Sequence, residues 1–398
     1  MRLGPRPLAF HLTLATMGCV TSKAALPLSN SASAHWNPDL RAKVAVLAEA
    51  AAATDPDALA RAIDLEARGR LDRFLTGVER YRDHPYSRGL DEPDPIWTDG
   101  NACLRRFGDT GPAVLLITSL INRSYILDLG SQRSFARWLA ARGFRCYLLD
   151  WRAPGDRERA YTIDDYVTGP LEGALDAAIG DSRGKVSVLG YCMGGLLALA
   201  LALRRRPDVS SLVLLATPWD FHADDAEQAA KLGTAMRLFE PQLALLGELP
   251  TDSLQYLFCT LDPFLGVRKF TAFAGLDMES DAAKRFVALE DWLNDGVPLA
   301  APVARACAFD WYEENQPGRG AWRIDGAPVR PEDWDGPTYV VIPAADRIVP
   351  PASAEGLAKT LPNAVVKRPR AGHIGMIAGR GVTRSIWTPL ANWLASQA

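Results

Sequence analysis

The chain has 398 residues, of which 48% are hydrophobic and 23% are charged, an ordinary balance for a globular protein. This length is enough to bury a large core, either as one elaborated domain or as two domains. Lysine and arginine number 44 against 47 aspartates and glutamates, a net charge of −3, so the basic surplus typical of nucleic-acid binding is absent.

The cysteines are scattered through the sequence, with no C-x-x-C pair and no histidine-rich cluster nearby. They are Cys19, Cys103, Cys146, Cys192, Cys259 and Cys307. This spacing predicts neither a disulfide framework nor a metal site. A reduced protein in the cytoplasm fits the pattern best.

The first 110 residues are predicted to form an N-terminal helical extension (1–110). Residues 8–20 are mostly apolar but too short to span a bilayer, so we expect an amphipathic or packing segment and no transmembrane helix. Residues 40–81 carry apolar side chains at helical spacing. Pro56 and Gly69 are expected to divide that pattern into more than one helix.

From residue 111 the chain alternates between predicted strands and helices, which is typical of a parallel sheet whose ligands bind at the carboxyl ends of the strands. The predicted strands cover 113–118, 144–149, 186–189 and 211–216, with helices over 131–142, from 162, and over 196–203. This first part of a sheet domain spans 111–218.

The alternation stops after residue 218. Residues 219–330 contain helices and loops rich in aromatic side chains, which predicts a helical cap inserted into the sheet domain; a helical subdomain with its own core is the alternative. Strand patterns return at 338–343 and 364–366. The second part of the sheet domain is therefore predicted at 331–398.

Cys192 lies in the segment GYCMGG (190–195), between an apolar strand and an apolar helix. This is the layout of a G-x-nucleophile-x-G turn, with a thiol in place of the usual serine hydroxyl. Few residues remain to make the turn, so we expect a strained Cys192 at its tip, above a helix N-terminus that favours the thiolate. Alone, the segment could also hold a buried structural cysteine or bind phosphate.

Two further residues complete a catalytic triad in the prediction. Asp346 follows the strand at 338–343, and His373 follows the last predicted strand. Cys192, Asp346 and His373 therefore lie at strand carboxyl ends, in the chain order of the α/β-hydrolase fold. His222 is the competing histidine, but it lies outside that order.

A developing negative charge on a substrate oxygen needs hydrogen-bond donors. The turn offers the backbone N–H of Met193, and the loop after the first core strand offers a second. We predict Ile121 as that second donor; the alternative role for Ile121 is core packing.

Several segments resemble one enzyme family. Residues 118–129 (TSLINRSYILDL), 149–154 (LDWRAP) and the cysteine turn at 190–195 are similar to signatures of polyhydroxyalkanoate synthases. Asp346 and His373 fall where the catalytic acid and histidine of that family fall. The resemblance implies an α/β-hydrolase fold: a mostly parallel sheet with helices on both faces and an inserted helical cap.

The resemblance also implies a reaction. The chain would polymerise 3-hydroxyacyl-CoA into polyhydroxyalkanoate through an acyl thioester on Cys192, with coenzyme A as part of the substrate and no separate cofactor or metal. The resemblance further implies a homodimer or a second synthase subunit, and attachment to polymer granules in the cytoplasm.

The chemistry of a thiol independently favours acyl transfer. Exchange of one thioester for another has a free-energy change near zero, and it keeps the acyl group activated. A cysteine hydrolase (thioesterase, esterase or polyester depolymerase) and a non-catalytic granule-binding protein are the alternatives. The intact set of Cys192, Asp346 and His373 argues against the latter, whereas the sequence leaves transferase and hydrolase open.

Overall fold

The computed structural model describes residues 2–29 and 38–397, and the chain divides into two compact units. The smaller unit combines Met1–Tyr86 with Phe258–Asn294, and the larger unit combines Ser87–Leu257 with Asp295–Ala398. Each unit is therefore assembled from segments that are distant in the sequence.

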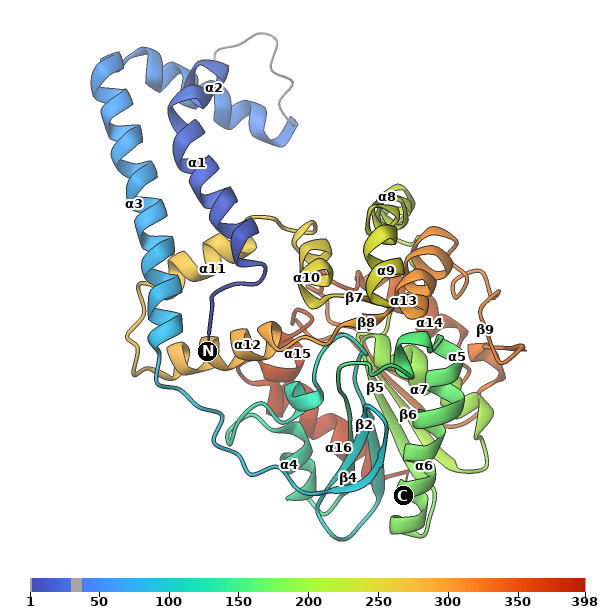
Figure 1. Cartoon of the computed structure of the whole chain (residues 1–398). Coiled ribbons are helices and arrows are strands. Elements are labelled where there is room, and N and C mark those ends of the chain that lie inside the picture. Colours follow the sequence, from blue (N-terminus) through green and yellow to red (C-terminus); the bar gives the residue numbers. More distant parts are fainter. Residues whose placement is uncertain (1, 30–37, 398) are drawn as a thin grey trace. The chain divides into compact units, whose positions relative to one another are not determined.

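The larger unit is built on an eight-stranded sheet with the strand order β1-β2-β4-β3-β5-β6-β11-β12 (Figure 1). The strands are β1 (Pro95–Asp99), β2 (Ala102–Phe107), β3 (Ala113–Ile117), β4 (Arg145–Trp151), β5 (Val186–Tyr191), β6 (Val209–Leu215), β11 (Thr338–Val341) and β12 (Ala364–Lys367). Neighbouring strands are antiparallel from β1 to β4 and parallel from β4 to β12. The predicted fold class, a mostly parallel α/β sheet, is confirmed.

Strands β1 and β2 correct the prediction that residues 1–110 form only a helical extension. They make an antiparallel hairpin around Gly100, which has a φ of 52°, and β2 pairs with β4. That pairing joins residues 39 to 49 positions apart in the sequence, so no local pattern indicates it. Pro56 begins a helix as expected, with Asp55 accepting a hydrogen bond from the Ala58 N–H.

Helices cover both faces of the sheet. Figure 1 shows α6 (Glu172–Ser182) and α7 (Met193–Arg204) on one face, and α4 (Phe135–Ala140) and α16 (Thr388–Ala395) on the other. Residues 193–202 of α7 are all buried, as expected for a helix that is apolar on every side. The same unit contains the α-helices α5 (Ile163–Tyr166), α14 (Pro351–Thr360) and α15 (Gly375–Ala378). It also contains the short 3₁₀ helices η1 (Ser124–Leu127), η2 (Glu158–Ala160) and η6 (Pro331–Asp333), and the π-helices η3 (Val167–Leu171) and η7 (Thr383–Trp387).

Residues 219–330, predicted as an inserted helical cap, are mainly helical. They form α8 (Ala226–Met236), η4 (Arg237–Phe239), α9 (Glu240–Leu246), α10 (Thr251–Cys259), α11 (Leu265–Phe273), α12 (Asp281–Asn294), α13 (Ala301–Arg305) and the π-helix η5 (Ala306–Glu313), with short strands β7 (Glu248–Leu249), β8 (Leu299–Ala300), β9 (Arg323–Ile324) and β10 (Ala327–Pro328). Helices α11 and α12 belong to the smaller unit and α8, α9, α13 and η5 to the larger one.

The smaller unit consists of α1 (Leu8–Ser29), α2 (Pro38–Ala52) and α3 (Pro56–Asp83), together with α11 and α12. Its core joins aromatic and aliphatic side chains of α3, α11 and α12: Phe74, Val78, Tyr81, Phe270, Phe273, Ala283 and Val287. Gly69, expected to divide the helical pattern, lies inside α3. A glycine in a helix interior costs only about 1 kcal/mol, which a long helix with a packed face absorbs.

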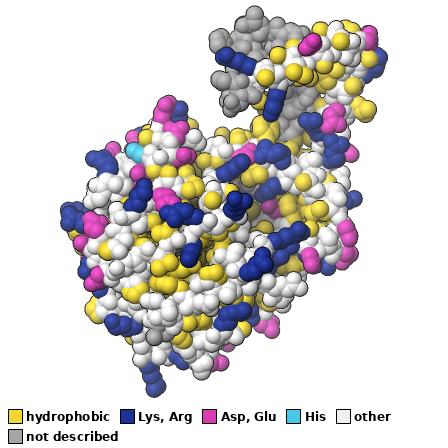
Figure 2. Space-filling view, turned by 180° about the vertical axis from the view of Figure 1, so that it is seen from behind, with side chains coloured by type: hydrophobic (Ala, Val, Ile, Leu, Met, Phe, Trp, Pro, Cys, Tyr) yellow, Lys and Arg dark blue, Asp and Glu magenta, His cyan; other side chains and the backbone are white. Residues whose placement is uncertain are grey.

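Among the described residues, no helix is long and apolar enough to cross a membrane. Figure 2 shows basic and acidic side chains interspersed over the face that it presents. This mixture agrees with the net charge of −3.

Candidate active site

Cys192 is the single residue between β5 and α7. Its φ of 57° and ψ of −128° are rare for a residue with a side chain. The Cys192 N–H donates to the Leu215 carbonyl at 2.9 Å, and the Gly195 N–H donates to the Cys192 carbonyl at 2.9 Å. The chain therefore makes the sharp strand-to-helix turn that the sequence predicts.

Glycines permit this turn because backbone approaches them closely. A Cβ on Gly190 would collide with the carbonyl of Gly194. A Cβ on Gly194 would collide with the carbonyl of Ile117 and with the backbone of Thr118, where the chain leaves β3. Because glycine has no side chain, the start of α7 packs directly on the end of β3.

Asp346 and His373 are brought together at the ends of β11 and β12. The His373 Nδ1 lies 2.7 Å from the Asp346 Oδ2, and both side chains are buried. The Asp346 Oδ1 accepts hydrogen bonds from the backbone N–H groups of Ile348 at 2.9 Å and Val349 at 3.0 Å. These donors hold the carboxylate in place, and the carboxylate in turn orients the imidazole.

His373 also lies close enough to Cys192 for the charge of the cysteine to act on the imidazole. Since Asp346 engages Nδ1, the Nε2 atom is the nitrogen left for the thiol. Burial acts to lower the pKa of His373, but the charge of Cys192 and the hydrogen bond with Asp346 outweigh it and raise that pKa to about 10. The raised pKa favours the protonated form of the His373 ring.

Two tyrosines near these residues were not singled out from the sequence. The Tyr191 ring lies 5.1 Å from the His373 ring, and the Tyr191 hydroxyl donates to the His373 carbonyl at 3.2 Å. Burial, followed by the charge of Cys192, raises the pKa of Tyr312 in η5. Tyr191 precedes the nucleophile directly, a signal that could have been used, whereas nothing local places Tyr312 near Cys192.

The predicted oxyanion donors lie on two separate elements. Met193 is the first residue of α7, where a backbone N–H has no acceptor within its own helix. Ile121 is half-buried in residues 118–124, which we call the β3 loop. Its carbonyl accepts a hydrogen bond from the Val297 N–H at 2.8 Å. The donor roles of Met193 and Ile121 stay predictions.

The competing histidine, His222, is engaged elsewhere. Its Nε2 lies 2.9 Å from the Tyr312 carbonyl, and its backbone N–H donates to the Asp220 carboxylate at 3.0 Å. Within residues 2–29 and 38–397, no three His, Cys, Asp or Glu side chains are grouped so that they could hold a metal ion.

The model of the alpha/beta hydrolase fold family matches residues 112–379, which is more than half of the sequence. The chain belongs to the α/β-hydrolase fold family. Among solved structures of this fold, the monoacylglycerol lipase of Paleococcus ferrophilus superimposes with a TM-score of 0.49 and 19% identity, covering 74% of this chain and 98% of the lipase.

Several relatives of the chain are poly(3-hydroxyalkanoate) polymerases, which confirms the resemblance found in the sequence. The chain is 28% identical to the poly(3-hydroxyalkanoate) polymerase subunit PhaC of Synechocystis sp. over 345 residues, 82% of this chain and 91% of the relative. It is 28% identical to the subunit PhaC of Haloferax mediterranei over 293 residues, 72% of this chain. That match spans only 59% of the length of the Haloferax protein.

Proposed function

We propose that this α/β-hydrolase-fold protein is an acyltransferase that polymerises 3-hydroxyacyl-CoA into polyhydroxyalkanoate. The observation that carries the proposal is the hydrogen bond between His373 and Asp346, on an imidazole that also feels the charge of Cys192. Cys192 stands at the tip of the strand-to-helix turn, where it offers a thiol as the nucleophile. The polymerase names of the relatives support the same reaction.

The first half of the reaction charges Cys192. The Nε2 of His373 takes the thiol proton, and the thiolate attacks the thioester carbonyl of 3-hydroxyacyl-CoA. The backbone N–H groups of Met193 and Ile121 stabilise the oxyanion. When the C–S bond to coenzyme A breaks, the proton on His373 goes to the leaving thiolate, while Asp346 holds the Nδ1–H of the imidazole throughout.

The second half transfers the acyl group. His373 removes the proton from the 3-hydroxyl group of the next unit or chain end, and the oxygen attacks the Cys192 thioester. An ester bond forms, the C–S bond breaks, and Cys192 recovers the proton from His373. The first step exchanges one thioester for another and is nearly balanced, while ester formation from a thioester is downhill.

The setting of the reaction belongs to the same proposal. Coenzyme A enters as part of the substrate, and the chemistry requires no metal and no separate cofactor. The protein acts in the cytoplasm at the surface of polymer granules, as a homodimer or with a second synthase subunit. The word "subunit" in the names of the relatives supports an assembly of this kind.

Purified protein incubated with 3-hydroxybutyryl-CoA tests the proposal. We expect release of coenzyme A together with insoluble polymer, and Cys192→Ala should lower the release rate by about three orders of magnitude or more. Release of free 3-hydroxybutyrate without polymer would show that the protein is a cysteine hydrolase and not a transferase. Turnover retained in Cys192→Ala would exclude Cys192 as the nucleophile.

A further inference from the structure

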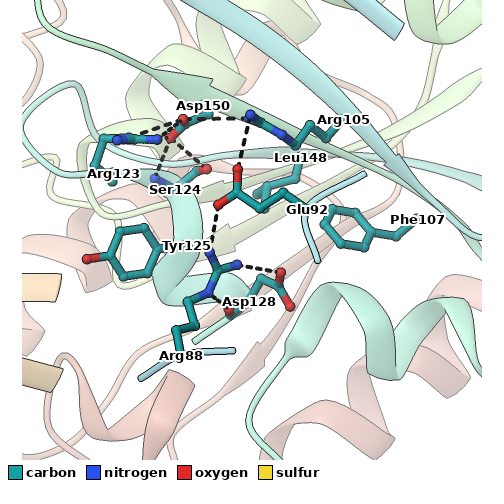
Figure 3. Close-up of a pocket in the computed structure, with 10 residues that line it drawn as sticks. All are labelled: Arg88, Glu92, Arg105, Phe107, Arg123, Ser124, Tyr125, Asp128, Leu148 and Asp150. Atoms are coloured by element: carbon teal, nitrogen blue, oxygen red, sulfur yellow. Dashed lines mark hydrogen bonds and ion pairs between the residues drawn. The ribbon is translucent and has the colours of Figure 1, made fainter. Parts of the chain in front are cut away.

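A second group of charged side chains lies beside the start of η1, in a lining that contains none of the triad residues (Figure 3). It surrounds a cavity of about 10 Å³, and its charged members are Arg88, Glu92, Arg105, Arg123, Asp128 and Asp150. A cavity of this size holds roughly one water molecule. The cavity is therefore too small for an organic ligand, and the role of the carboxylates lies in the chain segments that they hold.

Asp150, near the end of β4, holds the far end of the β3 loop. Its Oδ1 accepts hydrogen bonds from the Ser124 N–H at 2.9 Å and the Ser124 hydroxyl at 2.8 Å, and its Oδ2 accepts from Arg123 at 2.8 Å. The next residue holds the near end, because the Trp151 indole N–H donates to the Thr118 carbonyl at 3.2 Å. Two consecutive residues of β4 thus hold both ends of one loop.

The β3 loop also has contacts that fix its middle and its position against the nucleophile turn. The Ile121 carbonyl accepts a hydrogen bond from Val297 at 2.8 Å. The loop begins against Gly194, two residues after Cys192, at a contact too close for a side chain. The backbone around Ile121 is therefore set relative to Cys192 by β4 on one side and by the turn on the other.

A buried carboxylate is a costly way to hold a loop. Asp150 is only 2% exposed, and removing such a charge from water costs several kcal/mol. Burial acts to raise the pKa of Asp150, but the hydrogen bonds and charge of Arg123, with the Ser124 donors, lower it below its ordinary value. Apolar packing could supply equal stability, whereas only an acceptor can fix the direction of the Ser124 N–H.

We propose that Asp150 is a positioning residue for the acyl-transfer site: by fixing Ser124 and Arg123 it holds the β3 loop so that the Ile121 N–H meets the oxyanion of the substrate thioester. This inference rests on the proposed function, because it assigns Asp150 to the oxyanion step of that reaction. Asp128 supplies a matched comparison. It is equally buried and pairs with Arg88 at 2.7 Å and Arg137 at 2.8 Å, but its carboxylate has none of Asp150's bonds to the β3 loop.

Two reactions at Cys192 separate positioning from simple stability. Acylation by p-nitrophenyl butyrate passes through an oxyanion, whereas alkylation by iodoacetamide is a displacement at carbon without one. In single-turnover measurements on the full chain, Asp150→Asn should slow acylation about 10- to 100-fold, the range expected for a misplaced donor. Its alkylation rate should stay at the wild-type value, and Asp128→Asn should leave both rates unchanged.

The proposal is overturned if Asp150→Asn slows both reactions equally or neither, or if Asp128→Asn slows acylation as strongly. Should Asp150→Asn fail to fold, Ser124→Ala removes one donor to the same carboxylate and must slow acylation alone. Neither reagent contains coenzyme A, so the two proposals can fail separately. A wild type that p-nitrophenyl butyrate acylates, but that makes no polymer from 3-hydroxybutyryl-CoA, would overturn only the polymerase. A wild type that p-nitrophenyl butyrate cannot acylate would overturn both proposals.

Discussion

His373 is the residue whose charge state the fold changes most usefully. Its pKa rises from an ordinary 6.5 to about 10, because the charge of Cys192 and the bond to Asp346 outweigh burial. Above pH 6.5 the unfolded chain loses a proton that the folded protein keeps. The stabilisation from this group is therefore complete below about pH 6.5 and disappears as the pH rises through about 10.

This difference is measurable in the free energy of unfolding. Between pH 6.5 and about 10, the wild type should lose more stability than His373→Gln, which has no group to protonate at this position. Urea titrations across that interval give the two slopes. Parallel curves for wild type and His373→Gln would refute the electrostatic account of this site.

At the scale of elements, the junction of β5 and α7 depends on backbone contact at glycine. A Cβ on Gly194 meets the Ile117 carbonyl and the backbone of Thr118, neither of which is a flexible side-chain tip. We expect Gly194→Ala to lower the free energy of unfolding by about 1–3 kcal/mol and to slow alkylation of Cys192. Both effects are expected because the added methyl group forces α7 away from β3.

Gly180 in α6 is the matched control. A Cβ there has no heavy atom within 4 Å, and replacing glycine by alanine inside a helix stabilises it by about 0.5–1 kcal/mol. Gly180→Ala should therefore raise stability and leave alkylation of Cys192 unchanged. Equal losses in the two variants would show that the contact at Gly194 has no special role.

The elements that the sequence predicted well are those whose signals are local. The apolar strand and helix on either side of Cys192, and the capping box at the start of α5, where Thr162 and Asp165 cap each other, need only neighbouring residues to be recognised. The helix predicted over 131–142 is shorter in the structure, because Ser134 and not Ser131 caps its N-terminus. Ser134 also forms an isolated β-bridge with Asp128 through the backbone. That choice is made by a contact outside the helix.

The same limit applies to the site. Cys192, Asp346 and His373 could be placed together because parallel strands end at one edge of a sheet. The bond between Asp150 and Ser124 joins residues 26 positions apart through side-chain direction, which no spacing rule gives. Tyr312 is the extreme case, since its position near Cys192 depends on how η5 lies in the larger unit.

At the scale of the whole molecule, each unit is made of two chain segments that are separated in the sequence. Neither unit can therefore be completed in the order in which its residues follow one another. The smaller unit is complete only when Phe258–Asn294 joins Met1–Tyr86. Its core is shared by α3 and α11, where Phe270 packs edge-on against Phe74 at 6.4 Å and Tyr81 at 5.4 Å between ring centres. Separate cores predict separate stabilities.

Phe270→Ala tests this separation. Phe270 is fully buried, so its loss should cost the smaller unit about 3–5 kcal/mol, and hydrogen exchange should rise in α3, α11 and α12 while protection of β3, β5 and β6 is kept. Leu65→Ala on the exposed face of α3 is the control and should change stability by less than about 0.5 kcal/mol. Protection lost evenly from both units in Phe270→Ala would mean that the chain unfolds as one cooperative body, and that its two cores do not act independently.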